Sequence, residues 1–121
     1  MKIYVIHASN FDYINKLYEP LESSQVLEKH SLFFPHKDEA KEIKTKELIK
    51  NCDLVIAEVS LPSTGLGIEL GWSDYVQTPI LCVYEKGYKV SPSLKLITNN
   101  FIEYKDTNDL IDKISTFINN S

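Results

Sequence analysis

Residues 52–72 read CDLVIAEVSLPSTGLGIELGW, and the pattern that decides the fold begins here. Asp53 to Val59 is a nearly unbroken apolar run, as expected for a strand covered on both faces of a sheet. A turn with proline and glycine follows, and then a helix-length segment from Gly65 to Gln77. Pro79 to Tyr84 is a second buried-strand run. Two strands joined by a crossover of this length pair in parallel.

The same alternation of strand and helix extends in both directions along the chain. Further strands are predicted at Lys2–Ala8, Ser31–Phe34 and Phe101–Tyr104. Further helices are predicted from Asn10 or Asp12 onward with a kink or end at Pro20, at Asp38–Lys50, at Ser93–Thr98 and from Thr107 to about Asn119. We therefore expect one α/β domain, residues 1–121, with a flavodoxin-like sheet of about five parallel strands flanked by helices on both faces.

The composition excludes several classes of protein. The net charge is -4, and the 13 basic residues are all lysine. A protein without arginine and without a basic patch is not expected to bind a nucleic-acid polymer. No apolar run reaches the roughly 18 to 20 residues of a membrane helix, and Met1 leads directly into a strand, so we expect a cytoplasmic protein that does not contact a membrane.

Metal and disulfide sites are not indicated by the sequence. Cys52 and Cys82 lack the number and spacing of a disulfide framework or a zinc site, and we interpret them as small buried hydrophobic residues. No pair of histidines has metal-ligand spacing. We expect neither a metal nor an organic cofactor.

The Ser60–Gly67 loop follows the strand that ends at Val59, so it lies at the carboxyl edge of the predicted sheet. Ligands of open α/β sheets bind at that edge. Ser63 and Thr64 offer hydroxyls and an N-cap, and glycine at positions 65 and 67 leaves the backbone N–H groups accessible to a ligand. The loop is therefore predicted to hold an anion or a sugar.

Glu69 lies in the first turns of the helix that follows this loop, and two interpretations of it are open. The helix macrodipole favours a glutamate there, and Gly67 with Gly71 could serve close packing of the helix on the sheet. Alternatively, Glu69 lies between Ile68 and Leu70 behind two glycines, where a partly buried carboxylate with a chemical task would fit.

The stretch 52–72 closely resembles the signature of the nucleoside 2-deoxyribosyltransferase superfamily, especially its small branch of 2'-deoxynucleoside 5'-monophosphate N-glycosidases. In that superfamily, the glutamate of a G-x-E-L-G element attacks the anomeric carbon of deoxyribose. The matching residue is Glu69 in Gly67 to Gly71. The resemblance implies an enzyme, either an N-glycosidase or a deoxyribosyltransferase, that acts on a small nucleoside or nucleotide.

The resemblance also implies roles for other residues. Ser63 and the amides near Gly65 and Gly67 would contact the sugar or its 5'-phosphate. Ser93 corresponds to a serine that reaches into a neighbouring subunit's site, which implies a homodimer. Ser9 lies where the superfamily has a small-residue loop that binds substrate.

The sequence departs from the superfamily at the residue that assists departure of the base. Family members commonly have an aspartate about two helical turns before the strand that corresponds to Asp53–Val59, and Thr45 stands at that spacing. Glu47, Glu42, Asp38 or His36 could replace it, although each also fits a solvated surface group. The arginine that the hydrolase branch has in its first loop is missing as well.

Glu58 lies near the end of the predicted strand Asp53–Val59, which precedes the helix with Glu69. It could orient a hydroxyl or cap the Ser60–Thr64 loop, which is a supporting role.

The hypothesis for the whole chain is cleavage or transfer at the N-glycosidic bond of a (deoxy)nucleoside or its 5'-monophosphate. The alternatives are a nucleotide-binding module that has lost efficient chemistry, and an NAD-cleaving or nucleotide-sensing relative.

Overall fold

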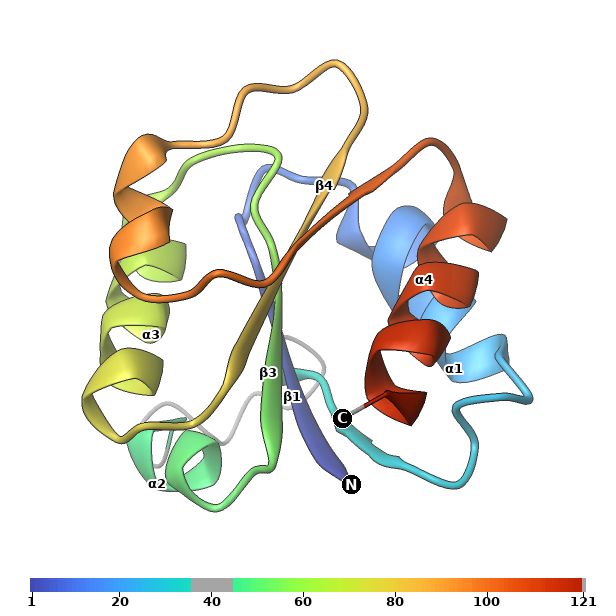
Figure 1. Cartoon of the computed structure of the whole chain (residues 1–121), viewed down its shortest axis with the longest axis horizontal. Helices are drawn as coiled ribbons and strands as arrows, with labels where there is room; N and C mark the ends of the chain where they lie inside the picture. Colours follow the sequence, from blue (N-terminus) through green and yellow to red (C-terminus); the bar gives the residue numbers. More distant parts are fainter. Residues whose placement is uncertain (36–44, 121) are drawn as a thin grey trace.

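A computed structural model of the chain describes residues 1–35 and 45–120, and its strands form a parallel sheet. The order is β2-β1-β3-β4-β5 (Figure 1). This is the predicted flavodoxin-like winding, which is therefore confirmed. The strands are β1 (Lys2–His7), β2 (Ser31–Phe33), β3 (Leu54–Glu58), β4 (Ile80–Glu85) and β5 (Phe101–Tyr104).

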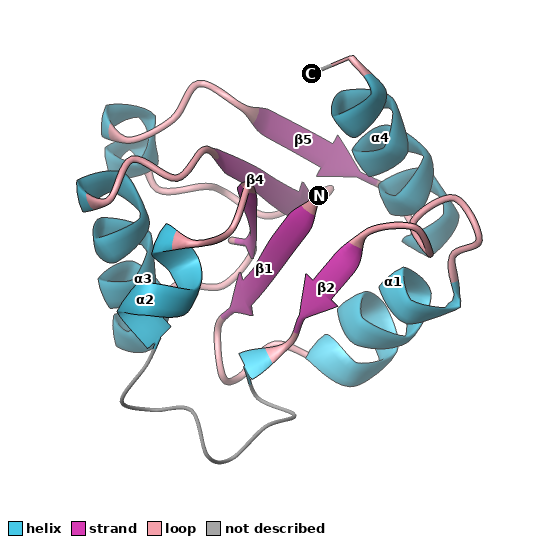
Figure 2. Cartoon of the chain, turned by 90° about the horizontal axis from the view of Figure 1, so that it is seen from below, coloured by secondary structure: helices cyan, strands magenta, loops and turns pink. Residues whose placement is uncertain are grey.

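Helices cover both faces of this sheet, as predicted. Helices α1 and α4 lie together on one face, whereas α2 and α3 lie on the other (Figure 2). The helical elements are η1 (Ile14–Tyr18), α1 (Glu19–Ser23), α2 (Thr45–Lys50), α3 (Thr64–Tyr75), η4 (Pro92–Leu96) and α4 (Thr107–Asn119). No helix within the described ranges is long and apolar enough to cross a membrane.

The register of the two central strands decides which side chains share a face. β1 pairs with β3 so that Tyr4 lies beside Val55 and His7 lies beside Glu58. Successive side chains of a strand point to opposite faces, and paired residues of parallel strands point to the same face. Tyr4 therefore faces the α2 and α3 side, whereas His7 and Glu58 face the α1 and α4 side.

The core consists of this sheet and the helix faces against it. Four residues in succession in β1, from Ile3 to Ile6, have no exposed surface, as expected for a strand covered on both sides. In α4, the stripe of Leu110, Ile114 and Ile118 is buried at helical spacing. Cys52 and Cys82 are free and buried.

Pro20 was predicted to kink or end the first helix, and the helix changes from π to α directly before it and then continues to Ser23. The preceding η1 is a π-helix, in which the Glu19 N–H donates to the Ile14 carbonyl. The described part of the next helix begins at Thr45, and its predicted start at Asp38 lies outside the described residues.

Candidate active site

A cavity of about 320 Å³ lies at the carboxyl edge of β1, beside the first turns of α3. It brings together Glu69, Ser63, Gly65 and Ser9, four of the residues that the sequence predicts for the site. They come from the loop after β1 and from the start of α3 after β3, two segments that are far apart in the chain but follow neighbouring strands. The lining consists of His7, Ser9, Ser63, Thr64, Gly65, Leu66 and Glu69.

The α3 helix begins at this cavity with free backbone donors. Ser63 is its N-cap, and the Ser63 Oγ accepts a hydrogen bond from the Leu66 N–H at 3.2 Å. The amides of Thr64 and Gly65 lie in the first turn of the helix, where no preceding helical carbonyl can accept from them. They therefore remain available to a ligand oxygen. The loop therefore has the donors of an anion or sugar site.

The glycines of α3 are not explained by packing within this chain. A Cβ atom added at Gly65, Gly67 or Gly71 would meet nothing within 4 Å. Each glycine in a helix costs about 1 kcal/mol relative to alanine. The interpretation that Gly67 and Gly71 serve close helix-to-sheet packing is therefore wrong, and both glycines instead border the apolar cavity between α3 and the segment around η4.

The Glu69 carboxylate is partly buried and has no compensating partner among residues 1–35 and 45–120. No hydrogen bond or ion pair reaches its oxygens from the described residues, and the Ser73 hydroxyl donates only to the Glu69 backbone carbonyl. Burial raises the pKa of Glu69 to about 7. A carboxylate with a strongly perturbed pKa in a cavity is a candidate for a functional role.

Tyr4 is the site neighbour whose place the sequence analysis missed. Its side chain is completely buried, and its hydroxyl makes no well-formed hydrogen bond with the described residues. Burial raises the pKa of Tyr4 to about 12, the nearby Thr45 hydroxyl opposes the shift, and the charge of Glu69 adds to it. The signal that could have placed Tyr4 is its alternation along β1, which sets it on the α3 face.

His7 is held as a packed ring beneath the loop that carries Ser9. Its Nδ1 donates to the Ala8 carbonyl at 2.8 Å, which leaves Nε2 to accept from the Tyr18 hydroxyl at 2.7 Å in the neutral ring. The Tyr13 ring stacks on it with 4.2 Å between centroids. His7 therefore supports the loop through its packing.

Glu58 lies on the opposite face of the sheet and anchors the loop before α3. Its carboxylate accepts hydrogen bonds from the Ser60 N–H at 2.7 Å, from the Ser60 Oγ at 2.9 Å and from the Tyr104 hydroxyl. Burial raises the pKa of Glu58, and these three hydrogen bonds oppose the rise. Ser60 Oγ in turn accepts from the Glu85 N–H at 2.8 Å, and Lys16 forms an ion pair with the Glu85 carboxylate at 3.2 Å.

Gly67 and Ser93 do not line the Glu69 cavity. Both line a neighbouring apolar cavity of about 680 Å³ between α3 and the segment around η4. Ser63 and Leu66 border both cavities. Within one chain, the structure therefore separates Gly67 and Ser93 from Glu69.

Of the candidates for the missing acid, Glu47 is the one within the described residues, and it does not line the cavity. Glu47 is exposed on α2. His36, Asp38 and Glu42 lie outside the described residues. Residues 1–35 and 45–120 contain no group of three or more histidine, cysteine, aspartate or glutamate side chains that could hold a metal ion.

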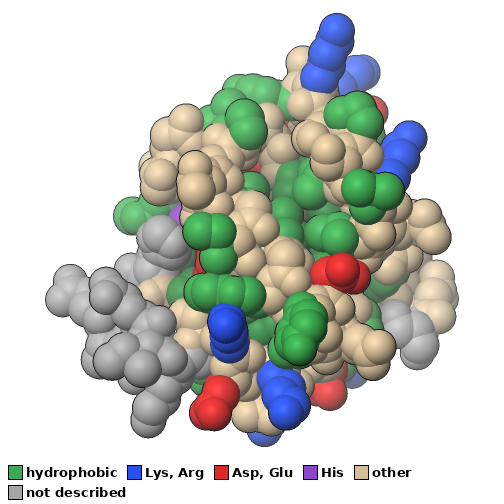
Figure 3. All heavy atoms as spheres, turned by 90° about the vertical axis from the view of Figure 1, so that its left-hand side faces the viewer, with side chains coloured by type: hydrophobic (Ala, Val, Ile, Leu, Met, Phe, Trp, Pro, Cys, Tyr) green, Lys and Arg blue, Asp and Glu red, His purple; other side chains and the backbone are tan. Residues whose placement is uncertain are grey.

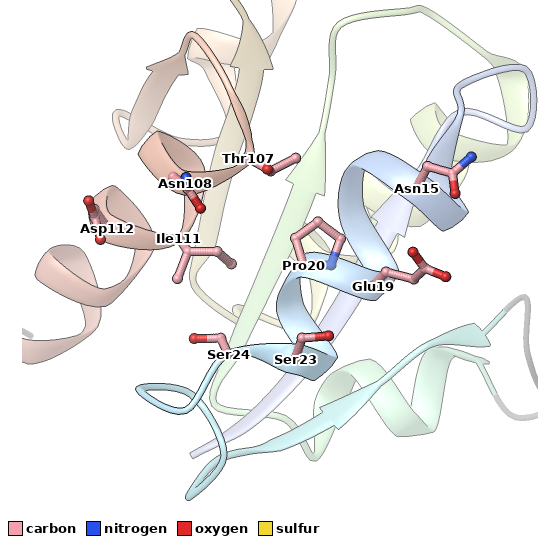
Figure 4. A pocket seen from close by; sticks show the side chains of 9 residues that line it. All are labelled: Asn15, Glu19, Pro20, Ser23, Ser24, Thr107, Asn108, Ile111 and Asp112. Atoms are coloured by element: carbon pink, nitrogen blue, oxygen red, sulfur yellow. The ribbon is translucent and has the colours of Figure 1, made fainter.

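A third cavity, of about 650 Å³, lies between α1 and α4 (Figure 4). It is bordered by polar side chains such as Asn15, Glu19 and Asp112. None of the predicted site residues lines it. It is on the sheet face away from Tyr4 and is not part of the site around Glu69.

Comparison with known proteins supports the resemblance carried by residues 52–72. No family model matches the chain. Over 52 residues, 43% of this chain, it is 38% identical to a Syntrophotalea carbinolica protein provisionally named 2'-deoxynucleoside 5'-phosphate N-hydrolase 1, and the match spans 36% of that relative's length.

Two solved structures share the fold over most of the chain. A CMP N-glycosidase of Clostridium botulinum is similar with a TM-score of 0.63 and 23% identity, over 92% of this chain and 97% of that one. A 2-deoxyribosyltransferase of Bacillus psychrosaccharolyticus is similar with a TM-score of 0.65 and 24% identity, over 91% and 90%. The chain therefore has the fold of the nucleoside 2-deoxyribosyltransferase superfamily, and the resemblance is confirmed.

The Glu69→Gln variant should be more stable than the wild type at high pH. A carboxyl whose pKa rises from 4.5 to about 7 on folding costs stability when it ionises, increasingly from about pH 4.5 and fully above about pH 7. We expect urea denaturation to show a free energy of unfolding about 2 kcal/mol higher at about pH 8, and nearly unchanged at about pH 4. The exposed Glu47→Gln is the control. An equal effect of Glu69→Gln at both pH values would contradict the uncompensated burial.

The Tyr104→Phe variant should be destabilised, because it removes one of the donors to the buried Glu58 carboxylate. We expect the free energy of unfolding to fall by about 2 kcal/mol, the range for a hydrogen bond to a charged group. Tyr75→Phe is the matched control, because Tyr75 is 87% exposed. If the two variants unfold at the same urea concentration, the Tyr104 contact does not stabilise the loop anchor.

Proposed function

We propose that this chain, which has the fold of the nucleoside 2-deoxyribosyltransferase superfamily, cleaves or transfers at the N-glycosidic bond of a (deoxy)nucleoside or its 5'-monophosphate. Glu69 is the nucleophile of this proposal. The observation that carries it is the uncompensated Glu69 carboxylate in a sugar-sized cavity beside free helix amides and serine hydroxyls. The names of the Clostridium and Syntrophotalea proteins refer to the same class of bond.

The proposed reaction proceeds by two displacements at C1' of the sugar. A Glu69 oxygen attacks C1', and the C1'–N bond breaks with its electron pair going to the base, which takes up a proton from the solvent. Water or a second base then attacks C1' from the other side and releases the Glu69 carboxylate. Two inversions retain the configuration, as in retaining glycosidases. No metal or organic cofactor takes part in this scheme.

The surrounding residues would hold the substrate and the nucleophile. In this proposal, the amides of Thr64 and Gly65 and the hydroxyls of Ser63 and Ser9, which line the cavity, would contact the sugar or its 5' group. The Tyr4 hydroxyl is a buried donor near Glu69, and it would orient the ionised carboxylate by a hydrogen bond.

A homodimer is the second part of the proposal. The α3 and η4 side of the molecule exposes large hydrophobic residues, including Tyr75 (87% exposed) and Leu96 (86%), and Figure 3 shows hydrophobic side chains spread over this side. Gly67 and Gly71 leave the helix bare there. A second copy on this side would cover apolar surface and could bring its Ser93 toward a neighbouring site. The cytoplasmic location stays a prediction.

Glu69→Ala should abolish release of free base from the substrate while the fold is kept. We expect kcat/KM to fall about 10³-fold or more, because the variant lacks the group that forms the covalent intermediate. Chromatography of the base released from deoxynucleosides, their 5'-monophosphates, ribonucleotides and NAD measures this. Rapid acid quench and mass spectrometry should detect a glycosyl ester on Glu69 in the wild type.

The other outcomes of that assay distinguish the alternatives. If the wild type releases no base from any compound while the ligands raise its melting temperature, the chain is a binding module. If NAD is cleaved and the other compounds are not, the substrate assignment is wrong. Adding an acceptor base separates transfer from hydrolysis.

Mixing two inactive variants should restore activity if Ser93 serves the partner's site. Ser93→Ala lacks the donated hydroxyl and Glu69→Ala lacks the nucleophile, so a mixed dimer keeps one intact site. We expect partial activity after co-refolding, and a dimer by sedimentation. Ser91→Ala, also exposed in the same segment, is the control. A monomer with full activity would contradict the shared site.

A further inference from the structure

The groups around Glu69 in the described residues are hydroxyls and amides. Ser9, Ser63 and Thr64 line the cavity with Glu69, and the buried Tyr4 hydroxyl lies near Glu69 and Thr45. His7 has both ring nitrogens engaged, one with the Ala8 carbonyl and one with Tyr18. These side chains bind and orient a sugar well, but they are weak proton donors to a departing base.

A neutral base leaves an N-glycoside with the electron pair of the broken bond and therefore needs a proton. A placed general acid contributes about 10²- to 10⁴-fold to such a step, and the best acid has a pKa near the working pH. The Tyr4 hydroxyl has a pKa of about 12, and an aliphatic hydroxyl such as that of Thr45 is a weaker acid still. Neither group supplies this acceleration at neutral pH.

A base that is already positively charged does not have this requirement. Its ring nitrogen is neutralised by the electron pair of the C1'–N bond, so the base leaves as a neutral molecule. The positive charge also lies next to the Glu69 oxygens before the reaction. Within a partly desolvated cavity, an adjacent cation favours the ionised carboxylate, so the substrate itself would activate the nucleophile.

We propose that the preferred substrates are nucleosides whose base carries a positive charge in the ground state, such as N7-alkylated purine or pyridinium nucleosides. The observation that carries this inference is the Glu69 carboxylate, which the described residues leave without a partner in a hydroxyl-lined cavity. The inference rests on the proposed function and specifies its substrate class. In this scheme Thr45, which stands at the sequence position of the superfamily's acid, delivers no proton.

Each step of the proposed reaction balances. A Glu69 oxygen forms an ester bond to C1', the C1'–N bond breaks, and the ring nitrogen takes the electron pair and loses its positive charge. A water oxygen then bonds to C1' as the ester bond breaks. Glu69 is regenerated as a carboxylate, and the proton of the water passes to the solvent. No oxidant, reductant or metal is consumed.

The experiment compares charged and neutral bases on the same sugar. The probes are N7-methyl-2'-deoxyguanosine against 2'-deoxyguanosine, and N7-methylguanosine against guanosine. Base release is measured by chromatography, and spontaneous release without protein is subtracted because the methylated compounds decompose slowly by themselves. We expect kcat/KM to be about 100-fold or more higher for the charged member of at least one pair, and to be lost in Glu69→Ala.

A pair of variants at Thr45 tests whether an acid introduced at this position speeds cleavage of neutral bases. Thr45→Asp introduces a carboxyl group that can donate a proton, so we expect faster cleavage of the neutral nucleosides and a smaller ratio of charged to neutral kcat/KM. Thr45→Asn is the matched control, because its size is similar and it carries no acid. If both variants change the ratio equally, Thr45 acts through shape and the inference is wrong.

The remaining outcomes separate this inference from the proposed function. Cleavage of both members of each pair at rates within about 10-fold, dependent on Glu69, would mean that an acid serves neutral bases. That result overturns the inference and keeps the function. Cleavage of a 5'-monophosphate but of none of the four nucleosides also overturns the inference alone. Base release unaffected by Glu69→Ala would overturn both.

Discussion

The Glu58 carboxylate is buried with no exposed surface, and the carboxyl edge of the sheet depends on how that charge is compensated. Leaving such a group unpaired would cost several kcal/mol, at roughly the scale of the whole stability of a small domain. The Ser60 amide and hydroxyl and the Tyr104 hydroxyl satisfy it. In doing so they link the end of β5 to the start of the loop that leads into α3, and the direction of α3 then places Glu69.

The two faces of the sheet thereby have different chemistry. On the α1 and α4 face, Glu58 and His7 have their hydrogen bonds made within the protein. On the α3 face, the Glu69 carboxylate and the Tyr4 hydroxyl receive no hydrogen bond from the described residues. Satisfied polar groups fix a structure, whereas unsatisfied ones in a cavity are available to a ligand. The strand register, with Tyr4 and His7 three residues apart in β1, creates this division.

Periodicity in the sequence was enough to predict the sheet, because buried parallel strands such as β1 and β3 are continuous apolar runs. The loop before α3 was also predictable from proline, serine and glycine. Pro20 does not end the first helix, but the change from a π-helix to an α-helix occurs directly before it. The separation of Gly67 from Glu69 depends on helix phase, and one partner of Glu58, Tyr104, lies in a strand distant in sequence. Such tertiary contacts leave no local signal.

The three glycines of α3 have a consequence for how the chain responds to its ligand. A helix with glycine at three positions has little intrinsic stability, and in α3 these glycines border the two neighbouring cavities without close contacts. Its backbone amides are therefore expected to exchange with solvent faster than those of α4, which has a buried stripe and no glycine. Binding at the cavity then orders a segment that is loosely held beforehand, and part of the binding energy is spent on that ordering.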